Sequence, residues 1–297
     1  MAKLGALAAV VLLIGLVLLP LGCGKAQPAK VLTDAERQKL AEAGDAAMQH
    51  NDYAEAMSYY RQAADSGDAT AMNGLGWLYE NGLGVDKDYA QAMKWYLKAA
   101  DAGYPQAMVN IGWLYQHGSG VKQNHAQAME WYRMAADSGN AQAMTRIARL
   151  YERGGFGVER NYGEAMSWFR KAADAGNTGA MAGIGWLYQN GFGVDQDYAQ
   201  AMTWYLKAVD GGNNFALCNI GVLYQNGLGV TASFAEARKW YEKAAEAGSS
   251  RAMNNLGSLY LNGLGVAKDP AKAKEWFERA AIAGYDPAKR WLAAQER

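Results

Sequence analysis

The sequence predicts an all-α solenoid, a stack of antiparallel helix pairs that repeats along most of the chain. One phrase that ends in glycine recurs at intervals of 36 residues, with a single interval of 37. Each copy carries helix-capping residues, and the composition, 51% hydrophobic with 5 prolines in 297 residues, suits a fully folded array. The recurring glycines are Gly67, Gly103, Gly139, Gly176, Gly212, Gly248 and Gly284.

The first residues differ from the repeats and are typical of a targeting segment. Lys3 is followed by an apolar run over residues 4–19 and by the ending Pro-Leu-Gly-Cys23. This ending resembles a bacterial lipoprotein signal, which implies that residues 1–22 are removed, that Cys23 is lipidated and that residues 23–32 form a linker. Alternatively, the apolar run is retained as a membrane anchor. Both alternatives place the protein in the cell envelope, membrane-anchored and facing away from the cytoplasm.

The next segment, residues 33–67, is expected to be an N-terminal cap. It contains the phrase Asn-Asp-Tyr-Ala-Glu-Ala-Met and ends on the recurring glycine, but it lacks the glycine-rich turn of the later copies. We therefore expect a shorter helix pair that closes this end of the array.

Each later copy reads as two helices joined by a short turn. In the first full copy the helices are expected over residues 68–82 and 88–103, and each begins with an aspartate and ends at a glycine. Helical spacing places Leu75 and Gly76 on the buried face, and Trp77 on the opposite side. The Gly-x-Gly turns, such as Gly82 with Gly84, lack the lysine and serine or threonine of a phosphate loop. We expect them to serve the backbone only.

Six full copies and a C-terminal helix complete the array. The extra residue of the long interval falls in the turn at residues 153–158, where an insertion costs least. Asp286 and Pro287 open a capping helix over residues 285–297. The six copies span residues 68–103, 104–139, 140–176, 177–212, 213–248 and 249–284.

The repeated wording resembles the Sel1-like repeat. The wording is Ala-Met-x-x-Leu/Ile-Gly-x-Leu-Tyr, then Asn-Gly-x-Gly-Val, then Ala-Met-x-Trp-Tyr-x-Lys-Ala-Ala. This resemblance implies a right-handed α-solenoid of the tetratricopeptide type, whose first helices line the concave face. The cap at residues 33–67 resembles the shorter tetratricopeptide form. Membership in this family implies a noncatalytic scaffold.

Composition and motifs exclude several functions. Lysine plus arginine and aspartate plus glutamate number 29 each, and neither sign forms a stripe, so a nucleic-acid surface is not expected. The three histidines share no spacing, and the 2 cysteines do not form a ligand pair, so no metal site is indicated. No cofactor motif and no nucleophile elbow occur. If Cys23 carries lipid, Cys218 remains as a lone thiol.

Comparison of the copies with one another suggests a binding surface. Four positions of the first helix vary between copies while the packing positions stay constant, and the resemblance places them on the concave face. Tryptophan and arginine, which dominate binding hot spots, occur among them. The candidate binding residues are Asn73, Trp77, Glu80, Asn81, Trp113, Gln116, His117, Arg149, Glu152, Arg153, Trp186, Gln189 and Asn190.

Structural roles compete with binding at several of these positions. Trp77, Trp113 and Trp186 alternatively pack against the first helix of the neighbouring copy. Arg149 and Arg153 alternatively form surface ion pairs with Glu152 or Glu159. The tryptophans at one position of every second helix are assigned to the core: Trp95, Trp131, Trp168, Trp204, Trp240 and Trp276.

Two functions from different classes follow. The first is a noncatalytic, membrane-tethered scaffold that binds a protein, peptide or polysaccharide in the cell envelope through the concave face. The second is an envelope enzyme of the β-lactamase-like type known among cysteine-rich Sel1-like relatives. Those relatives carry paired cysteines within their repeats, and this chain does not. We therefore expect a protein that is not an enzyme.

Overall fold

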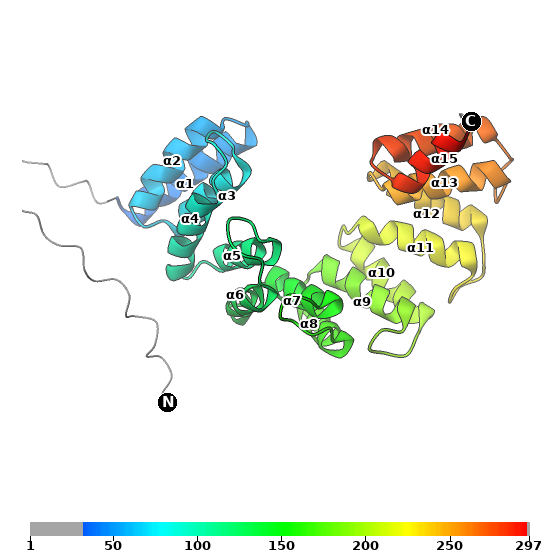
Figure 1. The fold of residues 1–297 in the computed structure, drawn as a ribbon, viewed down its shortest axis with the longest axis horizontal. Coiled ribbons are helices and arrows are strands. Elements are labelled where there is room, and N and C mark those ends of the chain that lie inside the picture. Colours follow the sequence, from blue (N-terminus) through cyan, green and yellow to red (C-terminus); the bar gives the residue numbers. More distant parts are fainter. Residues whose placement is uncertain (1–31, 296–297) are drawn as a thin grey trace, which may run out of the picture.

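The chain folds into a row of antiparallel helix pairs, which confirms the all-α solenoid (Figure 1). The computed structural model describes residues 32–295, which contain 15 α-helices ending with α15 (Asp286–Gln295). The first helices of the pairs are α1 (Asp34–Gln49), α3 (Ala69–Asn81), α5 (Pro105–His117), α7 (Ala141–Arg153), α9 (Thr178–Asn190), α11 (Phe215–Asn226) and α13 (Ser250–Asn262). The second helices are α2 (Tyr53–Asp65), α4 (Tyr89–Asp101), α6 (His125–Asp137), α8 (Tyr162–Asp174), α10 (Tyr198–Asp210), α12 (Phe234–Glu246) and α14 (Pro270–Ile282).

The pairs follow one another along an arc, with α1 and α2 at one end and α13 to α15 at the other (Figure 1). Each first helix packs against the second helix of its own pair and, from α3 onward, against the second helix of the preceding pair. Contacts are therefore local in sequence, as in other solenoids.

Helix ends follow the capping residues of the sequence. Asp68 accepts a hydrogen bond from the Ala71 N–H at 2.8 Å to start α3, and Gly82 ends α3 with a φ of 69°. Gly84 has a φ of 71°, and a Cβ there would lie 2.8 Å from the backbone of Tyr53 in the preceding pair. The turn therefore needs glycine for its left-handed conformation, as predicted, and also for its close approach to the preceding pair, which was not predicted.

Each pair closes around one buried aromatic ring of its second helix. In the pair α3 and α4, a Cβ on Gly76 would lie 2.5 Å from the Tyr96 ring, so the two helices meet through a glycine. Ala92 and Ala99 are fully buried beside this ring and keep the helices close. The rings that recur at this position are Tyr60, Tyr96, Tyr132, Phe169, Tyr205, Tyr241 and Phe277.

The recurring tryptophans are less buried than predicted. Of the six, only Trp95 is buried, and the other five are half-buried. Their position directly precedes the buried ring, at the edge of the packed face, so one side of each indole remains open to a cation. In five pairs a lysine or arginine three residues later lies 4.1 to 4.8 Å from the ring centroid. These cations are Lys98, Lys171, Lys207, Lys243 and Arg279.

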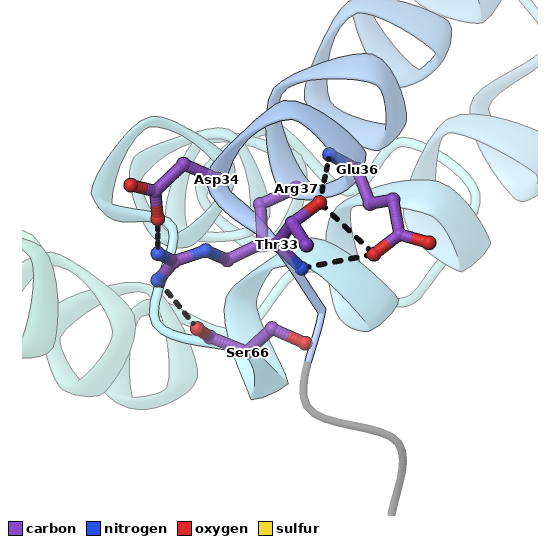
Figure 2. Close-up of polar contacts among 5 residues, drawn as sticks. All are labelled: Thr33, Asp34, Glu36, Arg37 and Ser66. Atoms are coloured by element: carbon purple, nitrogen blue, oxygen red, sulfur yellow. Dashed lines mark hydrogen bonds and ion pairs between the residues drawn. The ribbon is translucent and has the colours of Figure 1, made fainter.

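The first pair is closed at its start by side chains of α1 (Figure 2). Thr33 accepts from the Glu36 N–H at 3.3 Å, and the Glu36 carboxylate accepts from the Thr33 N–H at 2.9 Å. This capping box satisfies two helix-end donors. Arg37 donates to the Ser66 carbonyl oxygen at 2.9 Å and also contacts Asp34, so α1 is tied to the end of α2.

The inserted residue lies in the turn after α7, as predicted. Gly155 and Val158 form a two-residue β-bridge, and Phe156 at its tip has a φ of 48°. The Phe156 carbonyl accepts from the His125 N–H at 3.0 Å, and its ring meets the His125 ring edge-on at 4.9 Å. His125 occupies the first position of its helix, where most other second helices have tyrosine or phenylalanine. The turn with the inserted residue therefore packs against a smaller ring than the turns of the other copies do.

The last pair is covered by α15. Ala288 of α15 is fully buried, and the Trp291 ring lies 4.3 Å from the Phe277 ring. The helix begins at Asp286. Within residues 32–295 no helix is long and apolar enough to cross a membrane.

Candidate interaction surface

Three positions, one turn apart on each first helix, form a stripe that we call the first-helix row. The row consists of Asn73, Trp77 and Asn81; Val109, Trp113 and His117; Thr145, Arg149 and Arg153; Ala182, Trp186 and Asn190; Cys218, Val222 and Asn226; and Asn254, Ser258 and Asn262. Exposure increases along each helix. The first position is buried at Val109 and Cys218, whereas the last position is exposed in all six copies.

Neighbouring first helices touch through their side chains. Asn110 of α5 donates to the Asn73 amide oxygen of α3 at 2.9 Å. Arg251 of α13 donates from Nε to the Cys218 sulfur of α11 at 3.1 Å. Each bond joins a row residue, Asn73 or Cys218, to a residue beside the row on the next first helix, so the helices that carry the row are linked at these two junctions.

The three tryptophans of the row differ in their surroundings. Trp77 is 39% exposed. Trp113 is half-buried and stacks on His117 with ring centroids 4.3 Å apart. Trp186 is half-buried and lies 5.1 Å from Phe192, which the sequence analysis missed. Both ring partners belong to the tryptophan's own copy rather than to a neighbouring first helix.

Phe192 left only a partial signal in the sequence. It replaces the leucine of the Asn-Gly-Leu-Gly-Val turn, a position at which Ser119 and Phe156 also depart from leucine. Its ring also stacks on Tyr162 of the preceding pair at 4.6 Å. Trp186 therefore stands at one end of a three-ring cluster that joins two copies.

The central copy presents arginines in place of tryptophan. Arg149 forms an ion pair with Glu152 at 2.7 Å, one of the alternatives left open by the sequence, and its guanidinium lies 5.0 Å from the Phe169 ring centroid. Arg153 is exposed and has no ion pair with any residue that the structure describes. Arg153 therefore carries a charge that is available to a partner.

The fourth variable position turns inward, which differs from the prediction that Glu80 lies opposite the core. The Tyr96 hydroxyl donates to the Glu80 carboxylate at 2.5 Å. In the next copy the Tyr132 hydroxyl donates to Gln116, which is 8% exposed, at 2.8 Å. In the pair α9 and α10, the Tyr205 hydroxyl donates to Gln189 in the same way at 2.7 Å. These oxygens serve packing within a copy, so the row rather than this position faces outward.

Burial changes the acidity of these groups. It raises the pKa of the Glu80 carboxyl above its ordinary value, against the opposing effects of the Tyr96 hydrogen bond and of the charges of Lys87 and His117. Burial also raises the pKa of the Tyr132 phenol, so this hydroxyl stays a donor at neutral pH.

The last position of the row stabilises the helix end. The Asn81 amide donates to the Trp77 carbonyl oxygen at 2.9 Å, and the Asn190 amide does the same to Trp186 at 2.8 Å. The His117 ring nitrogen Nδ1 lies 2.9 Å from the Trp113 carbonyl oxygen. The remaining polar atoms of these exposed side chains face outward, so the row combines aromatic surface, amides and cations.

Comparisons with known proteins agree with this architecture. The Sel1 repeat model matches seven segments, residues 39–68, 69–104, 105–140, 141–177, 178–213, 214–249 and 250–285. The pair expected as an N-terminal cap is thus itself matched, in a shorter form. No curated protein matches the chain.

Solved structures are similar as well. A Sel1 repeat protein from Oxalobacter formigenes is 36% identical, with a TM-score of 0.75, over 82% of this chain and 99% of its own. A protective antigen of uropathogenic Escherichia coli with an SLR fold is 36% identical, with a TM-score of 0.69, over 87% of this chain but 56% of its own. The immunity protein Pa5087 of Pseudomonas aeruginosa is 19% identical over 86% of this chain and 84% of its own, with a TM-score of 0.50, and shows the fold alone. The repeats and these neighbours together show that the chain belongs to the Sel1 repeat family.

Proposed function

We propose that this protein is a noncatalytic scaffold that binds a polypeptide partner along the first-helix row. Sel1 repeats typically mediate protein–protein interaction. The observation that carries the proposal is the row itself, whose chemistry changes from copy to copy while hydrogen bonds link the helices that carry it at two junctions. A surface used only for packing would instead repeat the same residues, as the buried rings do.

The partner is proposed to be an extended peptide with acidic and apolar side chains. Arg153, the last row position of the central copy, is exposed, and Trp113 and Trp186 lie in the preceding and following copies. A cationic centre between indoles suits a carboxylate flanked by apolar residues. A polysaccharide would use the indoles and amides but not the cations, so the two ligand classes are separable by salt.

The cell envelope is the proposed location. Cys23 and the apolar run over residues 4–19 lie outside the described residues, so this proposal rests on the sequence. Globomycin should block removal of residues 1–22 from the unaltered protein, and substitution Cys23→Ala should abolish both lipid attachment and this removal. If the unaltered protein keeps residues 1–22 and globomycin does not change its size, the apolar run is instead a retained anchor.

Affinity capture from envelope extracts tests the binding proposal. The double variant Trp77→Ala with Arg153→Ala should lose most of a partner that the unaltered protein captures. The matched control, Lys94→Ala with Met134→Ala, changes an exposed cation and an exposed apolar residue on second helices and should capture normally. Equal capture by both variants would refute binding through the row.

The enzyme alternative is tested with the same preparation. The scaffold proposal expects no β-lactam turnover by the purified protein. Hydrolysis that a single substitution abolishes would contradict it.

A further inference from the structure

A hollow of about 560 Å³ lies away from the first-helix row, at the amino-terminal ends of three first helices. Residues 212–215 and 247–251 line it, together with Thr178 at the start of α9. These residues belong to the connections between copies. The row residues of the same copies are not among them.

The residues around the hollow depart from the repeat pattern. Phe215 is 87% exposed at its edge, where the four preceding copies carry Thr70, Gln106, Gln142 and Gly179. Gly211 replaces the alanine or serine that ends the preceding second helices, and a Cβ there would lie 2.3 Å from the Thr178 methyl group. The hollow is therefore specific to this junction and is not a by-product of the repeat.

Arg251 supplies a charge to the hollow that nothing neutralises within residues 32–295. Its Nε donates to the Cys218 sulfur at 3.1 Å, and an Nη donates to the Asn219 amide oxygen, so neutral groups on α11 hold the guanidinium. None of the ion pairs in the described part of the chain includes Arg251. None of the lining residues is acidic.

The start of α11 adds to the positive potential. Asn214 adopts a helical conformation and makes no side-chain cap, and the preceding Asn213 accepts from the Phe215 N–H at 3.1 Å. The next two N–H groups, of Ala216 and Leu217, have only long bonds of 3.4 and 3.3 Å to the Asn213 and Asn214 carbonyl oxygens. A weakly satisfied helix start beside an arginine favours an anion.

We propose that this hollow binds a carboxylate of a partner polypeptide, with an adjacent aromatic side chain lying on Phe215. Arg251 would hold the carboxylate through paired hydrogen bonds, and the exposed phenylalanine ring would be covered by the apolar neighbour. A polypeptide is favoured because charge and apolar surface stand side by side at an open edge. No row residue lines the hollow, although Arg251 contacts Cys218 of the row, so the site can bind a partner even if the row binds nothing.

The carboxylate has two sources, a chain terminus or an acidic side chain, and three labelled peptides distinguish them. The first is acetyl-Ala-Ala-Phe with a free carboxylate, the second is its amide, and the third is an amidated peptide with Glu-Phe in its interior. Fluorescence anisotropy with the full-length protein measures binding. Binding of the first alone indicates a chain terminus, and binding of the third indicates a side chain. Equal binding of the amide, or no binding of any peptide at millimolar concentration, would overturn the proposal.

Variants connect the binding to these residues. Arg251→Gln should lower the affinity for the bound peptide at least about tenfold. Arg251→Lys should recover only part of this affinity because lysine lacks the planar fork of donors that arginine offers to a carboxylate. Phe215→Ala should lower the affinity for the peptide several-fold and leave the stability of the fold unchanged, since the side chain is exposed. The controls Arg290→Gln and Gln142→Ala, and the row variant Trp77→Ala with Arg153→Ala, should bind unchanged. An unaltered affinity in Arg251→Gln and Phe215→Ala would refute the assignment.

Discussion

The central copy, residues 141–177, packs differently from the copies on either side. The flanking copies carry tryptophan in the row and a glutamine that accepts from a buried tyrosine. In the central copy the corresponding residues are Arg149, Glu152 and Phe169, joined by an ion pair and a cation–ring contact. Phe169 has no hydroxyl to satisfy, so the acid is free to pair with the arginine.

A second exchange involves the glycine that faces the buried ring. In the flanking copies Gly112 and Gly185 face the ring of their own pair, whereas the central copy has Ala148 there. Across the same Phe169 ring the next first helix supplies Gly183, whose added Cβ would lie 2.7 Å from the ring. Each of these three rings thus meets a glycine on one side, which comes from its own pair in the flanking copies and from the next first helix in the central copy. Packing and surface chemistry change together because they share one aromatic residue.

The largest expected effect on stability comes from replacing either glycine with alanine. Gly185→Ala and Gly183→Ala should each destabilise the protein by about 2–3 kcal/mol, because a methyl group would overlap a buried ring. Gly163→Ala, which meets no ring, is the matched control and should be neutral or slightly stabilising. Chemical denaturation measures these values. A loss of stability in Gly185→Ala but not in Gly183→Ala would contradict the proposal that Gly183 takes the packing role of the missing glycine in the central copy.

A smaller effect is expected from removing one hydroxyl. Tyr132→Phe leaves the buried Gln116 oxygen without its donor and should cost about 1–2 kcal/mol. The reciprocal change Phe169→Tyr should bring no gain, because Glu152 already pairs with Arg149. If Phe169→Tyr stabilises the fold, the ion pair does not substitute for the hydrogen bond.

The smallest effect concerns Glu80, which faces a tyrosine as the glutamines do but carries a charge. Because burial raises the pKa of Glu80 above 4.5, its contribution to stability is present below that value and is lost as pH rises through the folded pKa. Glu80→Gln keeps the acceptor for Tyr96 and should raise stability at pH 7 by less than about 1 kcal/mol, with no gain at pH 4. Melting temperatures at the two pH values measure this, and a destabilised variant at pH 7 would contradict it.

Most of the fold was predictable from the sequence because each copy repeats the same local instructions. Capping residues such as Asp68 and glycines such as Gly82 act within one turn, so a single copy suffices to recognise them. The inserted turn at residues 153–158 was located for the same reason. The half-burial of the recurring tryptophans was not predictable from the sequence. Helical spacing puts Trp95 and Trp131 at the same position but does not tell which side chains of other helices cover them.

The candidate surface was predictable only in part. The row positions follow from variation between copies, but the inward turn of Glu80 and Gln116 depends on a hydroxyl from another helix, which helical spacing does not contain. The sequence held a partial signal: three of the four full copies with tyrosine at the ring position carry glutamine here, whereas the copies with Phe169 and Phe277 carry glutamate and leucine. The hollow at residues 212–215 required the structure, because it joins three copies.

Site-specific photo-crosslinking in cells tests recognition by the first-helix row most directly. A photoreactive phenylalanine analogue placed at residues 77 and 153 of the row should crosslink one common partner. The same analogue at residues 97 and 206, where Leu97 and Leu206 are equally accessible on second helices, should not. Crosslinks from the second helices with none from the row would contradict the account.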